Sequence, residues 1–527
     1  MPRHTNVNPL ICAMLSGLML TASFPGISMT WLAWFALIPL LYGSSQLRPG
    51  AGFRMGFIAG LTHYLTLMYW LAYTMHTYGQ LPWLLSIPVL FLLAAWLATY
   101  IAFFSMLLTS LCASPMRLLL LSPALWTALE YIRTFLLTGL PWELLGYSQY
   151  QQLSIIQMAD IFGVYGVSFL IALANAAFLI LLLYVNKSAW GGHRISPTLA
   201  STAAAVLILA AGASWSYGTW RIQSVDDQLR TAPTCLAMIV QGNVDQSIKW
   251  DPAFQQRTTE KYIRLSLPAG PDKPELIVWP ETATPFYYQQ NSALGRLVQS
   301  AIQSAGTCFL IGSPSFVQKK IVEYYNSAYL INSNGAITGK YDKAHLVPFG
   351  EYVPLNKWLP FIGKMVQAAG DFRQGTAGGT LSMKDTQLGV QICYEIIFPD
   401  LARAAVLNNA GFLVNITNDA WFGRTAAPRQ HFSMAIFRAI ENKRFLVRSA
   451  NTGISGFIDP LGRITGSTAL FEEKALTRPV AVMELKTFYT RYGDIFAKTC
   501  VAVAVIFGIW YLFFPENYSK RIKLNHS

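Results

Sequence analysis

Charged residues are scarce in this chain. Asp, Glu, Lys and Arg make up only 12% of its 527 residues, well below the roughly 25% that is usual for soluble proteins. The shortage is uneven, because residues 1 to about 218 are nearly devoid of charge while about 222 to 490 have an ordinary soluble composition. This contrast excludes a single water-soluble domain and indicates one region in lipid and one in water.

Several signatures of cofactor sites are also missing. The sequence has no HExxH motif and no P-loop, and its six cysteines show neither CxxC nor metal-ligand spacing. We therefore expect no metal or nucleotide cofactor. The sequence leaves open whether Cys235 and Cys308 form a disulfide, although buried free thiols are the simpler interpretation.

The net charge of +13 would suggest nucleic-acid binding in a soluble protein. Here the basic residues do not interleave with aromatic residues in one patch, and many lie in short loops between apolar runs. We therefore expect no nucleic acid partner.

The apolar runs are long enough to cross a bilayer, which takes about 20 helical residues. Seven precede the charged region and one follows it: 8–25, 29–46, 54–75, 82–112, 117–138, 158–185, 197–217 and 497–514. The first run could pass for a signal peptide, but a second run follows closely and no small-residue cleavage site stands out. We expect it to be retained as a span.

The positions of the basic residues predict the orientation of these spans. Alternate loops and the C-terminal tail contain Arg3, Arg48, Arg54, Arg117, Lys187, Arg194, Lys520, Arg521 and Lys523. The opposite loops, near 26–28, 76–81 and 139–157, contain no Lys or Arg. By the positive-inside rule both termini lie in the cytoplasm and residues of about 218–496 lie outside it.

Two polar features of the apolar region have alternative interpretations. Glu130 and Arg133 are three residues apart on one expected helix, where charges are costly and usually paired. We favour an ion pair that locks the bundle over a contact with a lipid headgroup. Tryptophans near the expected span ends are simplest to interpret as interfacial belt residues: Trp31, Trp34, Trp70, Trp83 and Trp142.

From about residue 233 the pattern changes to short apolar runs separated by turn residues. Seven runs predict strands: 235–243, 275–282, 308–315, 326–337, 388–395, 411–418 and 445–453. Four segments predict helices: 253–265, 291–305, 398–408 and 428–442. Alternating strands and helices are typical of an α/β domain, and an Asn-Gly turn predicts a hairpin within 328–343.

Three residues at the ends of these runs could form a catalytic site. Cys393 follows the apolar run GVQI, Glu281 lies in WPET, and Lys343 lies in KYDKAHLVPFGEY. A thiol becomes a useful nucleophile when one group accepts its proton and another stabilises the charge. Taken singly, Glu281 would be a capping or salt-bridge residue, Lys343 a surface lysine and Cys393 a small buried hydrophobic residue. Their combination favours a site.

These segments, in the order Glu, Lys and Cys, resemble the nitrilase superfamily of carbon–nitrogen hydrolases over about 230–480. The whole chain is similar to the apolipoprotein N-acyltransferase family, which shares the runs QGNVDQSIKW, HLVPFGEYVP, CYEIIFPD, TNDAWFG and NTGISGFIDPLGR. The chain departs from the family pattern at Thr284 and Gly456, and neither position is one of the three.

The resemblance implies an architecture and a reaction. It implies about eight transmembrane helices plus an α-β-β-α sandwich, with a membrane domain at 1–220, a periplasmic catalytic domain at 221–490 and a last span and tail at 491–527. The implied protein is a monomer of the bacterial inner membrane. It moves an acyl chain from a glycerophospholipid, phosphatidylethanolamine by resemblance, to the α-amino group of the S-diacylglyceryl-cysteine of apolipoproteins.

The resemblance also implies residue roles: Glu281 as general base, Lys343 as oxyanion stabiliser and Cys393 as the nucleophile that carries a thioester. We expect Lys343 to lower the pKa of the Cys393 thiol. Supporting residues are Glu351, Tyr394 and Glu395, with Trp250 and Trp421 as an acyl-binding rim. Without the resemblance, the alternative interpretations are a simple salt bridge for Glu351 and ordinary core aromatics for Trp250 and Trp421.

The apolar stretch 354–372, with Lys357 and Lys364 on one expected helix face, predicts an arm that dips into the outer leaflet; a long buried loop is the alternative. Two other functions remain open. A membrane-tethered hydrolase of small amides or nitriles would use the same triad with water. A transporter or scaffold with an inactive domain is disfavoured by sparse intramembrane charge and the complete triad.

Overall fold

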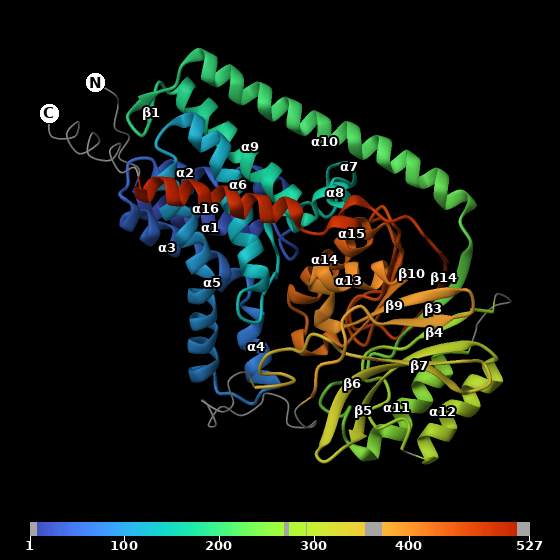
Figure 1. Cartoon of the computed structure of the whole chain (residues 1–527). Coiled ribbons are helices and arrows are strands. Elements are labelled where there is room, and N and C mark those ends of the chain that lie inside the picture. The colour runs from blue at the N-terminus through green and yellow to red at the C-terminus, as the bar shows by residue number, and fades with distance from the viewer. Residues whose placement is uncertain (1–7, 268–272, 291, 354–371, 514–527) are drawn as a thin grey trace.

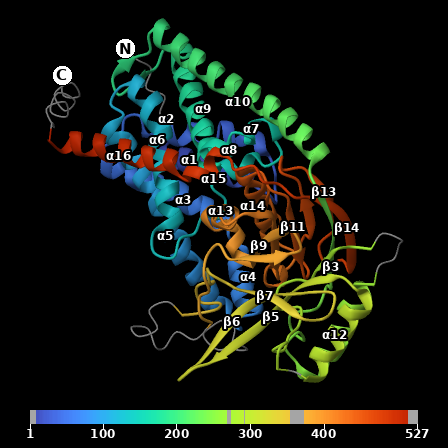
Figure 2. The same cartoon turned by 45° about the vertical axis from the view of Figure 1, so that its right-hand side comes forward.

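The computed structural model describes residues 8–267, 273–290, 292–353 and 372–513 (Figure 1). Helices from the N-terminal part of the chain gather on one side together with the C-terminal helix, and two sheets with their covering helices lie on the other. The view in Figure 2 shows the same separation and places α4 beside the sheet region. The two regions predicted from the charge distribution are therefore separate in space.

The helical region contains helices of very different lengths. They are α1 (Pro9–Ala22), η1 (Thr30–Trp34), α2 (Ile38–Ser44), α3 (Pro49–Leu67), α4 (Trp70–Thr77), α5 (Trp83–Leu111), α6 (Pro115–Phe135), η2 (Leu145–Gln149), α7 (Leu153–Ile156), α8 (Ala159–Phe162), α9 (Val164–Val185), α10 (Pro197–Thr231) and α16 (Ile495–Phe513), with a small hairpin of β1 (Ala189–Trp190) and β2 (His193–Arg194). Within the described residues, α5, α9, α10 and α16 are long and apolar enough to cross a membrane. The count of eight spans stays a prediction.

The prediction of one continuous helix over 29–46 is wrong. This segment folds instead as the short η1 and α2, and a neighbouring helix satisfies backbone groups that the break leaves free. Asn175 of α9 accepts a hydrogen bond from Leu37 N and donates one to Ala33 O, both at 2.9 Å. Irregular backbone at membrane depth is tolerated where protein groups supply such partners.

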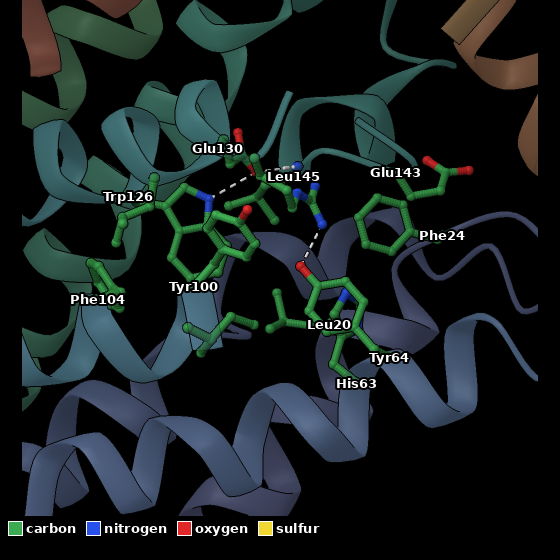
Figure 3. A pocket seen from close by; sticks show the side chains of 13 residues that line it. Leu20, Phe24, His63, Tyr64, Tyr100, Phe104, Trp126, Glu130, Glu143 and Leu145 are labelled. Atoms are coloured by element: carbon green, nitrogen blue, oxygen red, sulfur yellow. Dashed lines mark hydrogen bonds between the residues drawn. The ribbon is translucent and has the colours of Figure 1, made fainter. Parts of the chain in front are cut away.

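Glu130 and Arg133 of α6 do not form the predicted direct ion pair. Glu130 accepts hydrogen bonds from Trp126 Nε1 at 3.0 Å and from Leu145 N at 2.7 Å (Figure 3), whereas Arg133 donates to the hydroxyl of Tyr64. Both charged side chains are buried. They bind other parts of the bundle, which favours a structural role over a headgroup contact.

The long helix α10 leads from the bundle into the sheet region along one edge of the molecule (Figure 1). Its 35 residues correspond to about 52 Å of helix, more than the roughly 30 Å of a bilayer core. The predicted boundary at residue 220 falls inside this helix, which continues to Thr231. Arg221 in its second half binds Asp160 at 2.6 Å and holds it against the bundle.

The other region is built on two six-stranded sheets. Their strand orders are β13-β12-β11-β10-β9-β8 and β14-β3-β4-β5-β6-β7. The strands are β3 (Thr234–Gln241), β4 (Leu276–Val278), β5 (Cys308–Gln318), β6 (Val322–Ile331), β7 (Ile337–Asp342), β8 (Thr380–Met383), β9 (Thr386–Ile392), β10 (Ala410–Thr417), β11 (Leu446–Ala450), β12 (Gly456–Ile458), β13 (Ile464–Ser467) and β14 (Lys474–Ala481).

The sheets form the middle of a four-layer sandwich. Ile239 of β3 and Val414 of β10 share one core between the sheets. Helices α11 (Pro252–Leu265) and α12 (Ser292–Ala305) cover one outer face. Helices α13 (Pro399–Leu407) and α14 (Ala427–Asn442) cover the other and share a core with the bundle, and the short α15 (Phe488–Tyr492) precedes α16. The predicted α-β-β-α sandwich is confirmed, and one of its helical layers rests on the bundle.

Two tryptophans predicted to lie at the membrane interface are placed elsewhere. Trp70 and Trp142 are buried, and their indole N–H groups donate to Oε1 of Gln430 in α14 at 3.2 and 2.9 Å. The interfacial interpretation is wrong for these two residues because they join the bundle to the sandwich. Trp31 and Trp83 are exposed, at 60% and 46%, as belt residues would be.

Candidate active site

The three residues singled out in the sequence lie just beyond strands of the two sheets and meet in one place. Cys393 follows β9 and begins η3 (Cys393–Ile397), Glu281 follows β4 and Lys343 follows β7. Cys393 has a left-handed backbone with φ of 53°, a costly conformation for a residue with a side chain. Such strain persists only where the surroundings fix the turn, and it is common at functional sites.

Lys343 lies between two carboxylates. Its Nζ is 3.5 Å from Glu281 Oε1 and 3.0 Å from Glu351 Oε2. Asn326 Nδ2 donates to Oε1 of both carboxylates, at 2.7 Å to Glu281 and 2.8 Å to Glu351. Lys343, Glu281 and Asn326 are all buried. The amide therefore fixes both acids around one ammonium group, and Glu351 also accepts from Val347 N at 2.8 Å.

The pKa of the Cys393 thiol is higher than its ordinary value. Burial and, to a smaller extent, the negative charge of Glu281 raise the pKa of Cys393, Lys343 only partly offsets them, and the pKa is about 12. Lys343 does lower the pKa of the thiol as expected, but desolvation of a thiolate outweighs one nearby cation, so the net shift is upward. Burial also disfavours charge on Lys343, but Glu351 and Glu281 outweigh it and raise the pKa of Lys343. The resting site holds a neutral thiol beside a charged lysine.

Glu395 connects the turn at Cys393 to the segment after Lys343. One of its oxygens accepts from Tyr341 Oη, Ala344 N and His345 N at 2.9, 2.6 and 3.0 Å. The other accepts from Ile392 N at 2.6 Å. Burial raises the pKa of Glu395 to about 7. The carboxyl group thereby holds the turn at Cys393 against the segment after Lys343.

Tyr394 faces the bundle. Its hydroxyl donates to Gly139 O at 3.5 Å, and its ring packs edge-on against Phe398 with centroids 5.2 Å apart. These contacts shape the wall of the site.

A cavity of about 850 Å³ connects the site to the helical region. Cys393, Glu281 and Lys343 line one end, and residues of α4 and α5 such as Met75 and Leu93 line the other. Most of the wall is apolar, so the cavity suits an aliphatic chain better than a small polar molecule.

Trp250 and Trp421 also line this cavity, which is the position expected for an acyl-binding rim. Both are partly exposed, and the ring of Trp421 packs edge-on against Tyr78 at 5.4 Å. They are therefore wall residues rather than members of a closed core.

A second, much smaller cavity of about 20 Å³ lies within the bundle around His63, Tyr64 and Glu130 (Figure 3). None of the three proposed catalytic side chains lines it.

Three polar residues near the site were not identified from the sequence. Lys249 Nζ donates to Glu281 O at 3.0 Å, Asn326 bridges the carboxylates, and His431 Nε2 lies 3.3 Å from Cys393 O. Burial lowers the pKa of Lys249 to about 8. Lys249 directly precedes Trp250, and that position was the available signal. Asn326 and His431 come from a strand and a helix that sequence alone does not place at the site.

The predicted membrane arm at 354–372 lies, apart from residue 372, outside the described residues.

The question of a disulfide between Cys235 and Cys308 is answered by the structure, in which both are free thiols. Within the described residues, no group of three or more His, Cys, Asp or Glu side chains is arranged to hold a metal ion.

Comparison with known proteins matches the two regions of the chain to two different families. Residues 16–177 match the apolipoprotein N-acyltransferase N-terminal domain, and residues 236–488 match the carbon–nitrogen hydrolase family. An apolipoprotein N-acyltransferase of Geobacter metallireducens is 44% identical over 94% of both chains. One from Methylococcus capsulatus is 32% identical over 92% of both.

Solved structures that align with this chain include an amidase from Nesterenkonia. It is 19% identical with a TM-score of 0.37, covering 49% of this chain and 92% of the amidase. A carbon–nitrogen hydrolase from Helicobacter pylori is 17% identical with a TM-score of 0.36, covering 47% of this chain and 89% of that one.

Proposed function

The chain belongs to the apolipoprotein N-acyltransferase family, and on that premise we propose how its residues carry out N-acylation of lipoproteins. Cys393 is the nucleophile, Glu281 the general base and Lys343 the stabiliser of negative charge. The acyl donor is a glycerophospholipid, with phosphatidylethanolamine as our choice. The acceptor is the α-amino group of an S-diacylglyceryl-cysteine at the N-terminus of an apolipoprotein.

In the first half-reaction Glu281 takes the proton of the Cys393 thiol while sulfur attacks the ester carbonyl carbon. A C–S bond forms, and the carbonyl oxygen becomes an oxyanion near Lys343 Nζ. Such preorganised donors typically contribute about 3–4 kcal/mol each. The C–O bond then breaks, the departing oxygen takes the proton from Glu281, and lysophospholipid leaves a thioester on Cys393. The high pKa of the resting thiol makes proton removal part of the attack.

In the second half-reaction the neutral amine of the apolipoprotein attacks the thioester carbonyl. Glu281 accepts a proton from the amine nitrogen as the C–N bond forms. The C–S bond breaks, and the sulfur recovers a proton from Glu281. The products are an amide and the free thiol, so no net proton or cofactor is consumed by the enzyme.

The observation that carries this proposal is the position of the triad at the end of an apolar cavity that reaches α4 and α5. A hydrolase of small soluble amides would need no such chamber. Trp250 and Trp421 would border the acyl chain. Glu351 holds Lys343, and Glu395 and Tyr394 hold the turn that presents sulfur.

We also propose the cellular arrangement that the basic loops predict. The protein crosses the bacterial inner membrane with both termini in the cytoplasm and its sandwich in the periplasm. The spans occupy 1–220 and 491–527, the catalytic domain occupies 221–490, and the enzyme acts as a monomer.

The proposed function is tested on a defined substrate. A diacylglyceryl-modified test lipoprotein is incubated with the protein and phosphatidylethanolamine in detergent micelles, and the mass of its N-terminal peptide is measured by mass spectrometry. We expect a mass increase of one fatty-acyl group on the N-terminal amine. Release of free fatty acid with an unmodified peptide would instead show that water accepts the acyl group, and would contradict the proposed function.

A further inference from the structure

His431 of α14 is buried directly behind the nucleophile. Its Nε2 is 3.3 Å from the carbonyl oxygen of Cys393 and its Nδ1 is 2.9 Å from Asp419 Oδ1. The side chain is 1% exposed. Both of these oxygens only accept hydrogen bonds, so a neutral imidazole can donate to one of them at a time, and the group that donates to the other ring nitrogen decides which.

Charged and polar groups fix the other side of the imidazole. Arg448 Nη2 lies 2.8 Å from Asp419 Oδ2 and 3.0 Å from His431 Nδ1, and Thr417 Oγ1 donates to Asp419 Oδ1 at 3.0 Å. Burial and the positive charge of Arg448 lower the pKa of His431 and outweigh Asp419, which raises it, so the neutral ring is favoured. Arg448 Nη2 is a donor beside Nδ1 and also neutralises the Asp419 carboxylate, which favours the tautomer in which Nδ1 accepts from Arg448 and Nε2–H donates to Cys393 O.

The same cluster reaches the Cys393 carbonyl a second time. Arg448 also donates to Asn415 Oδ1, and Asn415 Nδ2 lies 3.5 Å from Cys393 O and 3.1 Å from Gln391 O. Both donors at this carbonyl are therefore held in place by Arg448.

The helical region completes the surroundings of the ring. Trp142 stacks on His431 with centroids 5.8 Å apart and planes inclined by 23°, and both line the cavity that contains Cys393. Trp142 is fixed by its bond to Gln430, whose Nε2 donates to Leu67 O of α3 at 3.3 Å. The imidazole of His431 thus lies between the Arg448–Asp419 ion pair of the sandwich and the ring of Trp142 from the bundle.

We propose that His431 is a positioning residue for acyl transfer, which holds the peptide between Cys393 and Tyr394 so that its N–H points at the oxyanion. The carbonyl and N–H of a trans peptide point in opposite directions, so fixing the carbonyl fixes the N–H. The backbone N–H that follows a nucleophile on a tight turn is a recurrent oxyanion donor. A hydrogen bond to the carbonyl also strengthens the N–H as a donor. This inference rests on the proposed function.

The test compares two reactions of the same thiol. Acyl transfer from phosphatidylethanolamine passes through an oxyanion, whereas alkylation by iodoacetamide displaces iodide and forms none. His431→Leu removes the donor, and His431→Gln supplies an N–H close to the position of Nε2. His63→Leu is the matched control, because His63 is also buried and lies in α3 away from Cys393. All are measured as the full chain in detergent, with Cys393→Ala as the background.

We expect His431→Leu to slow acyl-enzyme formation about 100-fold, as for loss of one oxyanion donor, with KM for the phospholipid and the alkylation rate changed less than about threefold. His431→Gln should recover at least about tenfold of the acylation rate. His63→Leu should lower Tm without this selective loss.

Two results with the variants would overturn the inference alone. One is acylation by His431→Leu at the wild-type rate. The other is an equal loss of acylation and alkylation that follows Tm and is not recovered by His431→Gln, which would show a structural role. Wild-type Cys393 that alkylates but never carries an acyl group would refute the proposed function, and this inference with it.

Discussion

The buried ammonium of Lys343 and the partly buried carboxylate of Glu351 form an ion pair, with Nζ 3.0 Å from Oε2. Lys343 is 1% exposed, so its charge depends on neighbouring acids rather than on water. Glu281 is the second acid at 3.5 Å. If Glu281 accepts a proton during the reaction, Glu351 is the acid that keeps Lys343 charged throughout.

Replacing Glu351 tests this dependence. Removing one partner of a buried pair leaves an uncompensated charge, which typically costs about 3–5 kcal/mol. We expect Glu351→Ala to lower stability by about 3 kcal/mol, because Glu281 still pairs with Lys343, and to slow N-acylation at least about tenfold.

The control for Glu351 is Glu323→Ala, which breaks the exposed pair with Lys319 at 2.7 Å. Its effect on Tm and activity should be small, since exposed pairs contribute little. Equal effects of the two changes would contradict the role given to Glu351.

The protonation state of Cys393 is a second test. Because burial and Glu281 raise its pKa to about 12, the thiolate fraction in the substrate-free protein stays small up to about pH 10. We expect the difference in ultraviolet thiolate absorbance between wild type and Cys393→Ala to appear only above that pH. A thiolate signal near neutral pH would show that Lys343 dominates, contrary to the structure.

Filling the cavity tests whether it holds the acyl chain. Leu93 of α5 lines it, whereas Leu92 beside it is 68% exposed. We expect Leu93→Trp to reduce turnover of a long-chain phospholipid about tenfold or more while sparing a short-chain analogue. Leu92→Trp adds the same volume outside the cavity and should leave both rates nearly unchanged. Identical behaviour of the two variants would place the acyl chain elsewhere.

Lys249 gives a prediction for stability as a function of pH. Its pKa is lowered from 10.5 to about 8 by burial, so between about pH 8 and 10.5 the unfolded chain binds more protons at this residue than the folded one. Stability should therefore rise with pH across this window, by about 3 kcal/mol at most for the full shift. Lys249→Met should flatten that rise in Tm measured from pH 8 to 10.5. The same dependence of Tm on pH in both proteins would contradict the lowered pKa of Lys249.

The interior of the sandwich was predictable because its strands are buried on both faces. Continuous apolar runs such as 411–418 and 388–395 leave little choice of structure, and the Asn-Gly turn correctly predicted the hairpin of β6 and β7, with Gly335 at φ of 79°. β14, at one edge of its sheet, was missed: Lys474, Thr477, Arg478 and Pro479 interrupt its apolar residues, and it takes its conformation from pairing with β3.

The bundle was less predictable. Hydropathy located the apolar runs but could not show that 29–46 is broken, since the side chain of Asn175 that satisfies its backbone comes from a distant helix. Trp70 and Trp142 were misplaced for a related reason. The sequence shows only that each tryptophan lies near a span end. That both indole N–H groups bond to Gln430 in the interior is visible only from the tertiary contacts.

The sequence brought attention to Glu281, Lys343 and Cys393, and the structure places them together. It could not supply the pKa of the thiol, because desolvation depends on packing from several elements. Asn326 and His431 were missed because a polar residue within a strand or on a buried helix has no distinctive local pattern.

The central claim is that acyl chains travel as a thioester on one cysteine. The most direct measurement is the intact mass of the full-length protein after incubation with phosphatidylethanolamine and no acceptor, followed by peptide mapping. We predict one added fatty-acyl group, located on Cys393, absent from Cys393→Ala and lost when a diacylglyceryl lipoprotein is added. An unmodified cysteine in a preparation that still N-acylates lipoprotein would contradict the account.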